Sequence, residues 1–240
     1  MQNKNCEKSL YCGIQDKEYP LLLRGLSKKP EKIYYKGNID IVNAYKNVAV
    51  IGSRNASKEG LRLAYETGQM VAEQGLNVVN GLALGCDTEA LRGALSKNGK
   101  CIAILPCGIE QVYPKSNRKL AELILENGGC ILSEYPPGTP IKKYQYVERD
   151  YLQSGISQGV LMIEAQEKSG TMHTVEFAIR QYKRLACYYA GILKGATGNQ
   201  YVEKLGKAEI LKVREDVQLF LEQVGTEDSY EQLSFDWSNI

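Results

Sequence analysis

Short apolar runs rich in β-branched residues alternate with longer amphipathic runs from Val48 onward. The short runs predict six strands, over residues 48–51, 77–79, 101–105, 130–132, 159–163 and 185–189. Apolar residues recur three and four positions apart between these runs, as in helices that pack on a sheet. They predict helices over residues 60–73, 87–97, 117–126 and 172–181. Strands that alternate with helices predict an α/β chain with an extended Rossmann-like fold, a mostly parallel sheet with helices on both faces.

The two ends of the chain have a different character from this alternating region. Residues 1–47 hold the stretch EYPLLLRGLSKKPEKIYYKGN, which predicts a lead-in segment packed on the edge of the sheet. Residues 48–225 form the expected Rossmann-like domain, which ends in a helix near residues 217–224. Residues 226–240 read TEDSYEQLSFDWSNI, which is polar and acidic with three aromatic residues, so we expect a flexible tail.

The composition of the chain limits the classes of function that it can have. The 240 residues are 43% hydrophobic, which is enough for one substantial core. Lys and Arg total 30 against 28 Asp and Glu, so an anionic partner must meet a local basic patch. Neither the N-terminus nor any other stretch has the apolar length of a signal peptide or a membrane span, so we expect a cytoplasmic protein without a membrane partner.

The chain has seven cysteines without a CxxC pair and a single histidine, His173. Several of the cysteines lie inside apolar runs, which is typical of buried, reduced thiols in the cytoplasm. One histidine among scattered cysteines does not match the ligand spacing of a zinc site. We therefore expect no metal and no cofactor.

The loops after the predicted strands are rich in glycine. They read GSRNASKEG, NGLALGCD, PCGIEQVYPKSN, SEYPPGTP and EAQEKSGT, in chain order. A doubly wound sheet binds ligands outside the carboxyl ends of its strands, where these loops gather. Glycine lets backbone amides converge on an anion, and a helix N-terminus adds about half a positive charge. The loops together predict a cradle for phosphates.

Cationic residues follow the same loops. Arg54 comes at a strand end, just before Ser57, which can cap a helix that begins with Lys58. Two further basic groups are Lys115, Arg118 and Lys119, and Lys142, Lys143 and Arg149. The candidate phosphate or DNA contacts are Gly52, Ser53, Arg54, Ser57, Lys58, Gly81, Gly85, Lys115, Asn117, Arg118, Arg149, Ser169, Gly170 and Thr171.

Aromatic residues are interleaved with these cations, and successive bases of a single strand stack on such rings. They are Tyr113, Tyr135, Tyr144 and Tyr146. Other polar residues of the loops have structural alternatives. Asp87 and Asn117 fit helix caps, whereas Glu134 and Glu164 fit acceptors of backbone hydrogen bonds that organise the loops.

Motifs in this order resemble those of the DNA-processing protein A (DprA, also called Smf) family. VAVIGSR stands for the family's IVGSR, and VVNGLALGCDTEALRGAL stands for SGxAxGID followed by AHxGAL. GIEQVYPKSNRKL, SEYPPGTP and GVLMIEAQEKSGTMHT match three further segments, and KGATGNQYVEKLGKA resembles the closing helix. The resemblance covers most of the chain.

The resemblance implies a homodimer that binds single-stranded DNA without sequence preference. It also implies delivery of that DNA to the RecA recombinase in DNA uptake or recombination, with no catalytic residue. The chain departs from the family at FPxRNRIIAGLS, which reads YVERDYLQSGIS here. Arg149 is retained, Asp150 replaces an asparagine and Tyr151 replaces an arginine, which removes one positive charge from this segment and adds one negative charge. The Tyr151 ring could instead stack on a base.

Two alternatives remain open. SGTMHTVE partly matches the GGxGTxxE loop of the LOG-type phosphoribohydrolases, which would make Glu176 the acid and Arg149 its upstream arginine in a nucleotide hydrolase or sensor. The stretch YEQLSFDW resembles sliding-clamp-binding peptides and would make the chain an interaction module.

Overall fold

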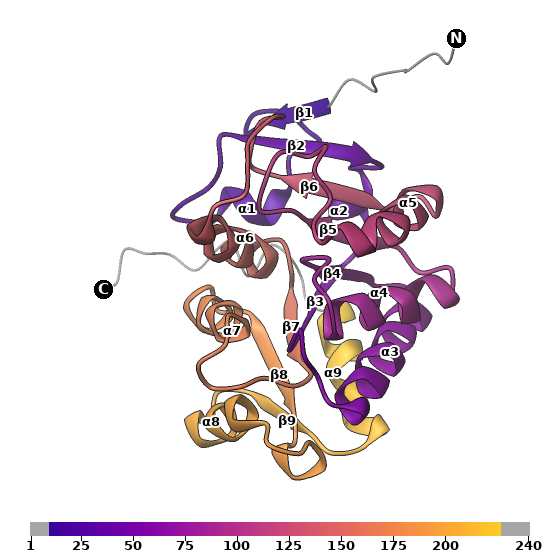
Figure 1. Cartoon of the computed structure of the whole chain (residues 1–240), viewed down its shortest axis with the longest axis vertical. Helices are drawn as coiled ribbons and strands as arrows, with labels where there is room; N and C mark the ends of the chain where they lie inside the picture. The colour runs from indigo at the N-terminus through magenta and orange to yellow at the C-terminus, as the bar shows by residue number, and fades with distance from the viewer. Residues whose placement is uncertain (1–9, 227–240) are drawn as a thin grey trace.

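A computed structural model describes residues 10–226 and shows one sheet flanked by helices (Figure 1). Within this range nine strands lie in the order β1-β2-β6-β5-β4-β3-β7-β8-β9. The strands are β1 (Leu10–Gly13), β2 (Lys32–Gly37), β3 (Asn47–Ile51), β4 (Asn77–Asn80), β5 (Cys101–Ile104), β6 (Cys130–Ser133), β7 (Gly159–Met162), β8 (Arg184–Tyr188) and β9 (Glu209–Leu211). The seven strands from β3 to β9 are all parallel to one another. The predicted fold class is therefore confirmed.

The helices of the described residues alternate with the strands. They are α1 (Leu21–Arg24), α2 (Ile41–Ala44), α3 (Lys58–Glu73), α4 (Cys86–Ser96), α5 (Arg118–Glu126), α6 (Lys143–Gly155), α7 (Thr171–Arg180), α8 (Thr197–Leu205) and α9 (Arg214–Thr226), with short 3-10 turns η1 (Lys115–Asn117) and η2 (Ala190–Ile192). The predicted strands and main helices lie within about two residues of these bounds. Of the predicted tail, residues 226–240, Thr226 is the last residue of α9, and the rest, with the stretch YEQLSFDW, lies outside the described residues.

Alternation along the strands divides the core between the two faces of the sheet. Val48 and Val50 of β3 point to the face covered by α3, α4, α5 and α9. Ala49 and Ile51 point to the opposite face, where α7 and α8 pack. The part of that face under the first two strands is covered by α1, α2 and α6. The result is a sheet covered by helices on both faces, as the short, nearly all-apolar strands require.

The prediction of six strands is too low, because β1, β2 and β9 join the sheet as well. The lead-in segment adds β1 and β2 as antiparallel strands, and β2 pairs with β6. These strands are less buried than the parallel ones. In β2 the buried Ile33 lies between the exposed Lys32 and the half-buried Tyr34. In β1 the buried Cys12 follows the exposed Tyr11. An alternating strand gives a weaker signal than the buried runs of the parallel strands.

The order of the strands fixes where the loops meet. From β3 the chain moves one way along the sheet through β4, β5 and β6, and from β7 it moves the other way through β8 and β9. The loops that follow β3 and β7 therefore separate at a switch point of the sheet, where α/β folds place their ligand sites. The loops after β4 and β5 lie beside it on the same carboxyl edge.

Candidate functional site

The loop after β3 is held by Glu164, which follows β7. The buried Glu164 carboxylate accepts a hydrogen bond of 2.6 Å from the Ser57 hydroxyl and further bonds from the Ser57 N–H. Its backbone oxygen accepts from the Ser53 N–H at 2.7 Å. The Ser57 hydroxyl also accepts from the Gly60 N–H, so Ser57 caps α3. Both expectations, that Ser57 caps this helix and that Glu164 organises loops, are confirmed.

This arrangement changes the predicted role of Ser57. Its hydroxyl and its N–H are both committed to the Glu164 carboxylate, which already provides the negative charge that the start of α3 favours. A phosphate at the same place would be repelled by that carboxylate. Ser57 therefore positions the loop instead of contacting phosphate, whereas Arg54 and Lys58 remain exposed on either side of it.

The loop after β4 wraps around Asp87, in the first turn of α4. The buried Asp87 carboxylate accepts from the Gly81 N–H at 3.0 Å and from the Ala83 N–H at 3.2 Å. Burial raises the pKa of Asp87 to about 6, although the charge of Arg149 and these two N–H groups oppose the shift. Asp87 thus organises a loop and does not cap α4, whose N-cap is Gly85.

Gly81 and Gly85 are needed for close approach of chain segments. A Cβ at Gly81 would lie 1.1 Å from Nη1 of Arg149, and a Cβ at Gly85 would lie 2.2 Å from the Ser53 carbonyl oxygen. Gly85 also has a φ of 75°, which disfavours other residues. The Gly81 N–H is bonded to Asp87, so its predicted phosphate contact does not fit. These glycines bring three loops together.

Arg149 of α6 lies beneath these loops and is only 5% exposed. Its Nε is 2.9 Å from Oδ1 of Asp150, and its Nη1 lies 3.4 Å from the carbonyl oxygen of Ile104. Burial raises the pKa of Asp150, against the opposing charges of Arg149 and His173. The prediction that Arg149 reaches phosphate directly does not fit this depth. Its charge acts from below the surface, and Asp150 offsets much of it.

The Tyr146 ring connects the buried Arg149 to the exposed Arg54. The guanidinium carbon of Arg54 lies 5.2 Å from the centre of this ring, and that of Arg149 lies 6.0 Å from it. Burial raises the pKa of Tyr146, and the neighbouring charges of Arg54 and Arg149 oppose the shift. Tyr113 lies close enough to influence the same hydroxyl. Arg54, Tyr146 and Tyr113 thus come together from three different loops or helices.

Asn117 attaches the segment after β5 to the same edge. Its side-chain amide donates to the Leu82 carbonyl and to the Thr88 hydroxyl, each at 2.9 Å. The side chain is buried and makes no capping bond to α5, so neither of its predicted roles, helix cap or phosphate contact, fits. Its contribution is to hold the exposed Lys115 and Arg118 against the loop after β4.

The start of α7 completes the site. The Thr171 hydroxyl donates to the Gly52 carbonyl oxygen at 3.1 Å, which joins this turn to the loop after β3. Gly170 is the N-cap and is exposed, and the Ser169 hydroxyl oxygen is buried without a hydrogen-bond partner among the described residues. A Cβ at Gly52 would lie 2.5 Å from Sγ of Cys86, so this glycine also permits close packing.

We call the exposed and half-buried residues that these contacts gather the rim. The rim consists of Ser53, Arg54, Lys58, Tyr113, Lys115, Arg118, Tyr146, Ser169, Gly170 and Thr171, with Arg149 beneath it. Arg54 and Lys115 therefore share one edge of the sheet with Arg149. The contact between Arg54 and Tyr146 could not be read from the sequence, because 91 positions separate the two residues.

Two residues near the rim differ from their predicted roles. The Tyr151 ring packs edge-on against Phe177 with centroids 5.2 Å apart, and its hydroxyl accepts from the Lys28 N–H at 3.2 Å. It is therefore not placed to stack on a base. Glu134 was expected to accept backbone hydrogen bonds, but its Oε1 is buried without a partner among the described residues. Burial and the charge of Glu148 raise the pKa of Glu134 to about 7.

The residues proposed for a hydrolase do not form a pair. Glu176 lies on the exposed side of α7, and its carboxylate is 3.7 Å from the guanidinium of Arg180. Arg149 is buried and engaged with Asp150. No observation on Glu176 therefore supports a catalytic acid.

The described residues also include cysteines, possible metal ligands and helices whose length and polarity bear on a membrane span. The six cysteines in this range are free and buried, as predicted. Across residues 10–226, acidic, cysteine and histidine side chains form no group of three that could hold a metal ion. None of the described helices has the length and apolar character to cross a membrane.

The sequence of this chain is similar to those of several known proteins. The model of the DNA recombination-mediator protein A family matches residues 11–222. DNA processing protein DprA of Streptococcus pneumoniae is 35% identical over 193 residues, which are 80% of this chain and 67% of that protein. Protein Smf of Borreliella burgdorferi is 35% identical over 166 residues, which are 69% of this chain and 52% of that protein. The chain thus spans about half to two thirds of these relatives.

Solved structures of proteins of this kind also have the same fold as this chain. DNA processing protein A of Streptococcus pneumoniae superposes with a TM-score of 0.80 at 32% identity, over 89% of this chain and 74% of that one. The Helicobacter pylori protein, described for its single-stranded DNA binding mode, has a TM-score of 0.80 at 27% identity, over 90% of this chain and 96% of that one. A molybdenum cofactor binding protein of Rippkaea orientalis shares the fold alone, with a TM-score of 0.56 at 18% identity over 75% of this chain and 97% of that one.

Proposed function

We propose a function from the premise that this chain belongs to the DNA recombination-mediator protein A family, which the match over residues 11–222 shows. In this proposal the rim binds single-stranded DNA without sequence preference. The bound strand is then delivered to a RecA recombinase during DNA uptake or recombination. The six cysteines within residues 10–226 are free and buried, which is typical of cytoplasmic proteins. We therefore propose that the chain acts in the cytoplasm.

The observation that carries the proposal is the stack of Arg54 on Tyr146, with its charge exposed at the switch point of the sheet. A guanidinium held by a ring keeps its N–H groups available for a phosphate and loses little freedom on binding. Lys58, Lys115 and Arg118 are exposed on the same rim and can follow a backbone across several nucleotides.

The rim also explains why binding would not depend on sequence. Tyr113 is 49% exposed, and its ring can stack on any base because every base has a π-face. The cations and rings of the rim would meet phosphates and base faces, whereas sequence readout requires polar groups directed at base edges. A strand held mainly through its phosphates should bind less tightly as salt rises, by about 0.7 log units per contact for each log unit of salt.

The test is the affinity of the Arg54→Ala variant for a labelled oligothymidylate of about 20 nucleotides, a length that exceeds a single binding site. We expect a loss of about 1–3 kcal/mol, because one charge-assisted phosphate contact is removed. Arg180→Ala is the matched control, since it removes an exposed arginine from the far end of α7. The salt slope should also fall by about 0.7 in Arg54→Ala and stay constant in the control.

Equal affinities of Arg54→Ala and the unaltered chain would remove the rim from the proposal. Delivery to a recombinase and homodimerisation are separate parts of it. The first predicts that the chain accelerates RecA loading on DNA coated with a single-strand-binding protein, and that Arg54→Ala does not. The second predicts a mass of twice 26.8 kDa by light scattering.

A further inference from the structure

The hairpin of β1 and β2 has one face that the fold buries only in part. Tyr34, Lys32 and Lys36 have the same parity along β2 and point to one side, whereas Ile33 points to the other side and is buried. On β1 the partner of Tyr34 is Tyr11. We call these four residues, Tyr11, Lys32, Tyr34 and Lys36, the hairpin face.

The two rings of the hairpin face lie next to each other. Tyr11 is 57% exposed, whereas Tyr34 is half-buried and packs against the core. The neighbouring Cys12 is 2% exposed and packs into the core with Tyr19. The ring centres of Tyr11 and Tyr34 are 5.9 Å apart at an angle of 49°. Nζ of Lys32 lies 5.1 Å from the centre of the Tyr11 ring. An exposed ring beside a half-buried one, flanked by lysines on a sheet, is an arrangement on which single-stranded bases can stack.

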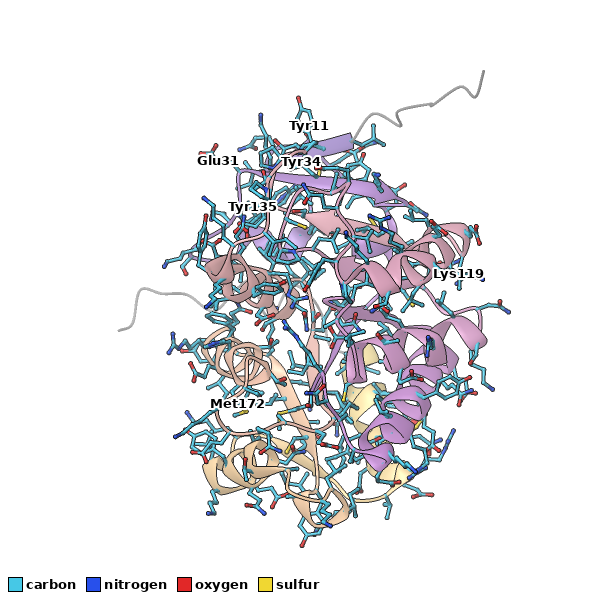
Figure 2. The ribbon with its side chains drawn as sticks, in the orientation of Figure 1. Tyr11, Glu31, Tyr34, Lys119, Tyr135 and Met172 are labelled. Atoms are coloured by element: carbon cyan, nitrogen blue, oxygen red, sulfur yellow. The ribbon has the colours of Figure 1, made fainter. Side chains whose placement is uncertain are left out.

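The hairpin face adjoins the loops that lead to the rim. Tyr34 is opposite Ser133 at the end of β6, and the chain continues from there through Tyr135 to α6. Figure 2 labels Tyr11 and Tyr34 at the hairpin end of the molecule and Tyr135 between the hairpin and α6. α6 carries Tyr146, whose ring holds Arg54 on the rim. A strand that leaves the rim beside α6 can therefore continue onto the hairpin.

Two contacts tie the loops between these surfaces together. The Gly138 N–H donates to Oε1 of Glu110 at 2.6 Å, and the Gly108 N–H donates to the Thr139 carbonyl oxygen at 3.0 Å. Although burial opposes the shift, backbone N–H groups, including that of Gly138, lower the pKa of Glu110, with smaller contributions from a side-chain hydrogen bond and the charge of Lys36. The Glu110 carboxylate is thus occupied within the loop.

We infer that the hairpin face is a second stacking surface for single-stranded nucleic acid, reached by the same strand that the rim binds. The inference rests on the proposed function of the rim. Tyr11 and Tyr34 would each take the face of one base, and Lys32 and Lys36 would lie beside the connecting phosphates. The binding site would then be longer than the rim alone.

The test compares two lengths of labelled oligothymidylate on the full chain, about 6 nucleotides and about 20 nucleotides, since single sites cover about 4–16. Tyr11→Ala should weaken binding of the longer strand about tenfold and change binding of the shorter strand less than twofold. Tyr11→Trp should restore the affinity for the longer strand, because a larger ring also stacks. Tyr45→Ala, another exposed tyrosine outside both surfaces, is the matched control and should bind both lengths normally.

A second measurement locates the contact directly. Photo-crosslinking of a 5-iodouracil strand of about 20 nucleotides, followed by peptide mass spectrometry, should find Tyr11 or Tyr34. The inference is overturned if Tyr11→Ala binds the longer strand as the unaltered chain does, or if it dimerises differently and loses affinity for both lengths. If Arg54→Ala still weakens the shorter strand in that case, the rim keeps its proposed function. Failure of the unaltered chain to bind either length would instead remove the proposed function itself.

Discussion

Two clusters of buried polar residues lie at opposite edges of the same sheet, and they are built in opposite ways. The amino edge holds a cluster of neutral amides, whereas the carboxyl edge holds a cluster of charges. The amide cluster consists of Asn47, Asn77 and Gln158. The charged cluster consists of Asp87, Arg149 and Asp150.

The side-chain amides of Asn47 and Asn77 donate their hydrogen bonds within the fold. The Asn77 amide donates to the Ile41 carbonyl at 2.9 Å and to Oδ1 of Asn47 at 2.8 Å. The Asn47 amide donates to the carbonyls of Val42 and Ile156 at 2.9 and 2.8 Å. These bonds join α2, the end of α6 and two strands. Neutral amides that use these donors inside the fold stabilise it and do not offer them to a ligand.

The charged cluster is less complete. Arg149 faces two buried carboxyl groups, and burial raises the pKa of both. Nearby, the Ser169 hydroxyl and Oε1 of Glu134 are buried without partners among the described residues. Polar groups left over in a folded chain mark the places where a protein gives up stability for a ligand. In the proposed function, binding therefore falls on the carboxyl edge, and the amino edge contributes stability.

The largest effect is expected from Arg149→Met, which leaves Asp87 and Asp150 buried without their cation. Removing one partner of a buried ion pair costs about 3–5 kcal/mol, and urea unfolding at pH 8 should show that loss. The loss should shrink toward pH 5. Without the cation the two folded-state pKa values rise further, so the folded variant binds protons that the unfolded chain releases, and its stability falls as pH rises.

The double variant Arg149→Met with Asp150→Asn is the control for this interpretation. Replacing Asp150 as well removes one of the two uncompensated charges and leaves Asp87, so part of the lost stability should return. A double variant as unstable as the single one would show that packing against Gly81 and Ile104, and not charge, sets the role of Arg149.

Asn77→Ala tests the other edge and should cost about 2–4 kcal/mol in urea unfolding. It leaves the Ile41 carbonyl and Oδ1 of Asn47 without a donor, and each buried group without its bond costs about 1–3 kcal/mol. The affinity for an oligonucleotide should stay unchanged, which distinguishes this edge from the rim. If Asn77→Ala lowered both the affinity and the stability, the two edges of the sheet would not have separate roles.

The sequence predicted much of this fold, because the strands from β3 to β8 are buried on both faces and therefore read as apolar runs. It missed β1 and β9, which are short, and it missed α6, whose inward face carries Gln145, Arg149 and Gln153. A helix that buries polar residues gives no apolar stripe. Its polarity has a physical reason, since α6 supplies the charged cluster and packs over the carboxyl edge.

The candidate site was predicted at the level of loops and less well at the level of side chains. Glycine-rich strand ends located the carboxyl edge, and Arg54 and Lys115 lie on the rim as their positions suggested. Ser57, Gly81 and Asn117 support the loops instead, because their polar groups meet Glu164, Asp87 and Leu82. Hydrogen bonds between residues far apart in the chain decide which polar groups remain free to bind a ligand. The spacing of residues along the sequence does not predict these bonds.

Glu134→Gln tests the carboxyl edge further, and we expect it to raise the stability of the folded chain by a smaller amount. Because its folded-state pKa is about 7, Glu134 binds a proton more tightly in the folded chain than in the unfolded one, where the value is about 4.3. Its carboxyl therefore lowers stability as pH rises from about 4.3 through about 7. A neutral amide removes that loss, so Glu134→Gln should be about 1–3 kcal/mol more stable at pH 8 and nearly unchanged at pH 4. An unchanged pH profile would show that Glu134 is solvated.

The smallest effect is expected from Glu176→Gln, which changes a charge outside both clusters. Its ion pair with Arg180 is exposed on both sides, and exposed pairs contribute about 0–1 kcal/mol. Unfolding should therefore shift by less than about 0.5 kcal/mol. The same variant examines the hydrolase alternative, because Glu176 is the residue that would act as its acid. Incubation of the unaltered chain with AMP should release no adenine, and the variant should behave identically. Adenine release that Glu176→Gln abolishes would make Glu176 catalytic and would move the functional centre from the rim to the exposed side of α7.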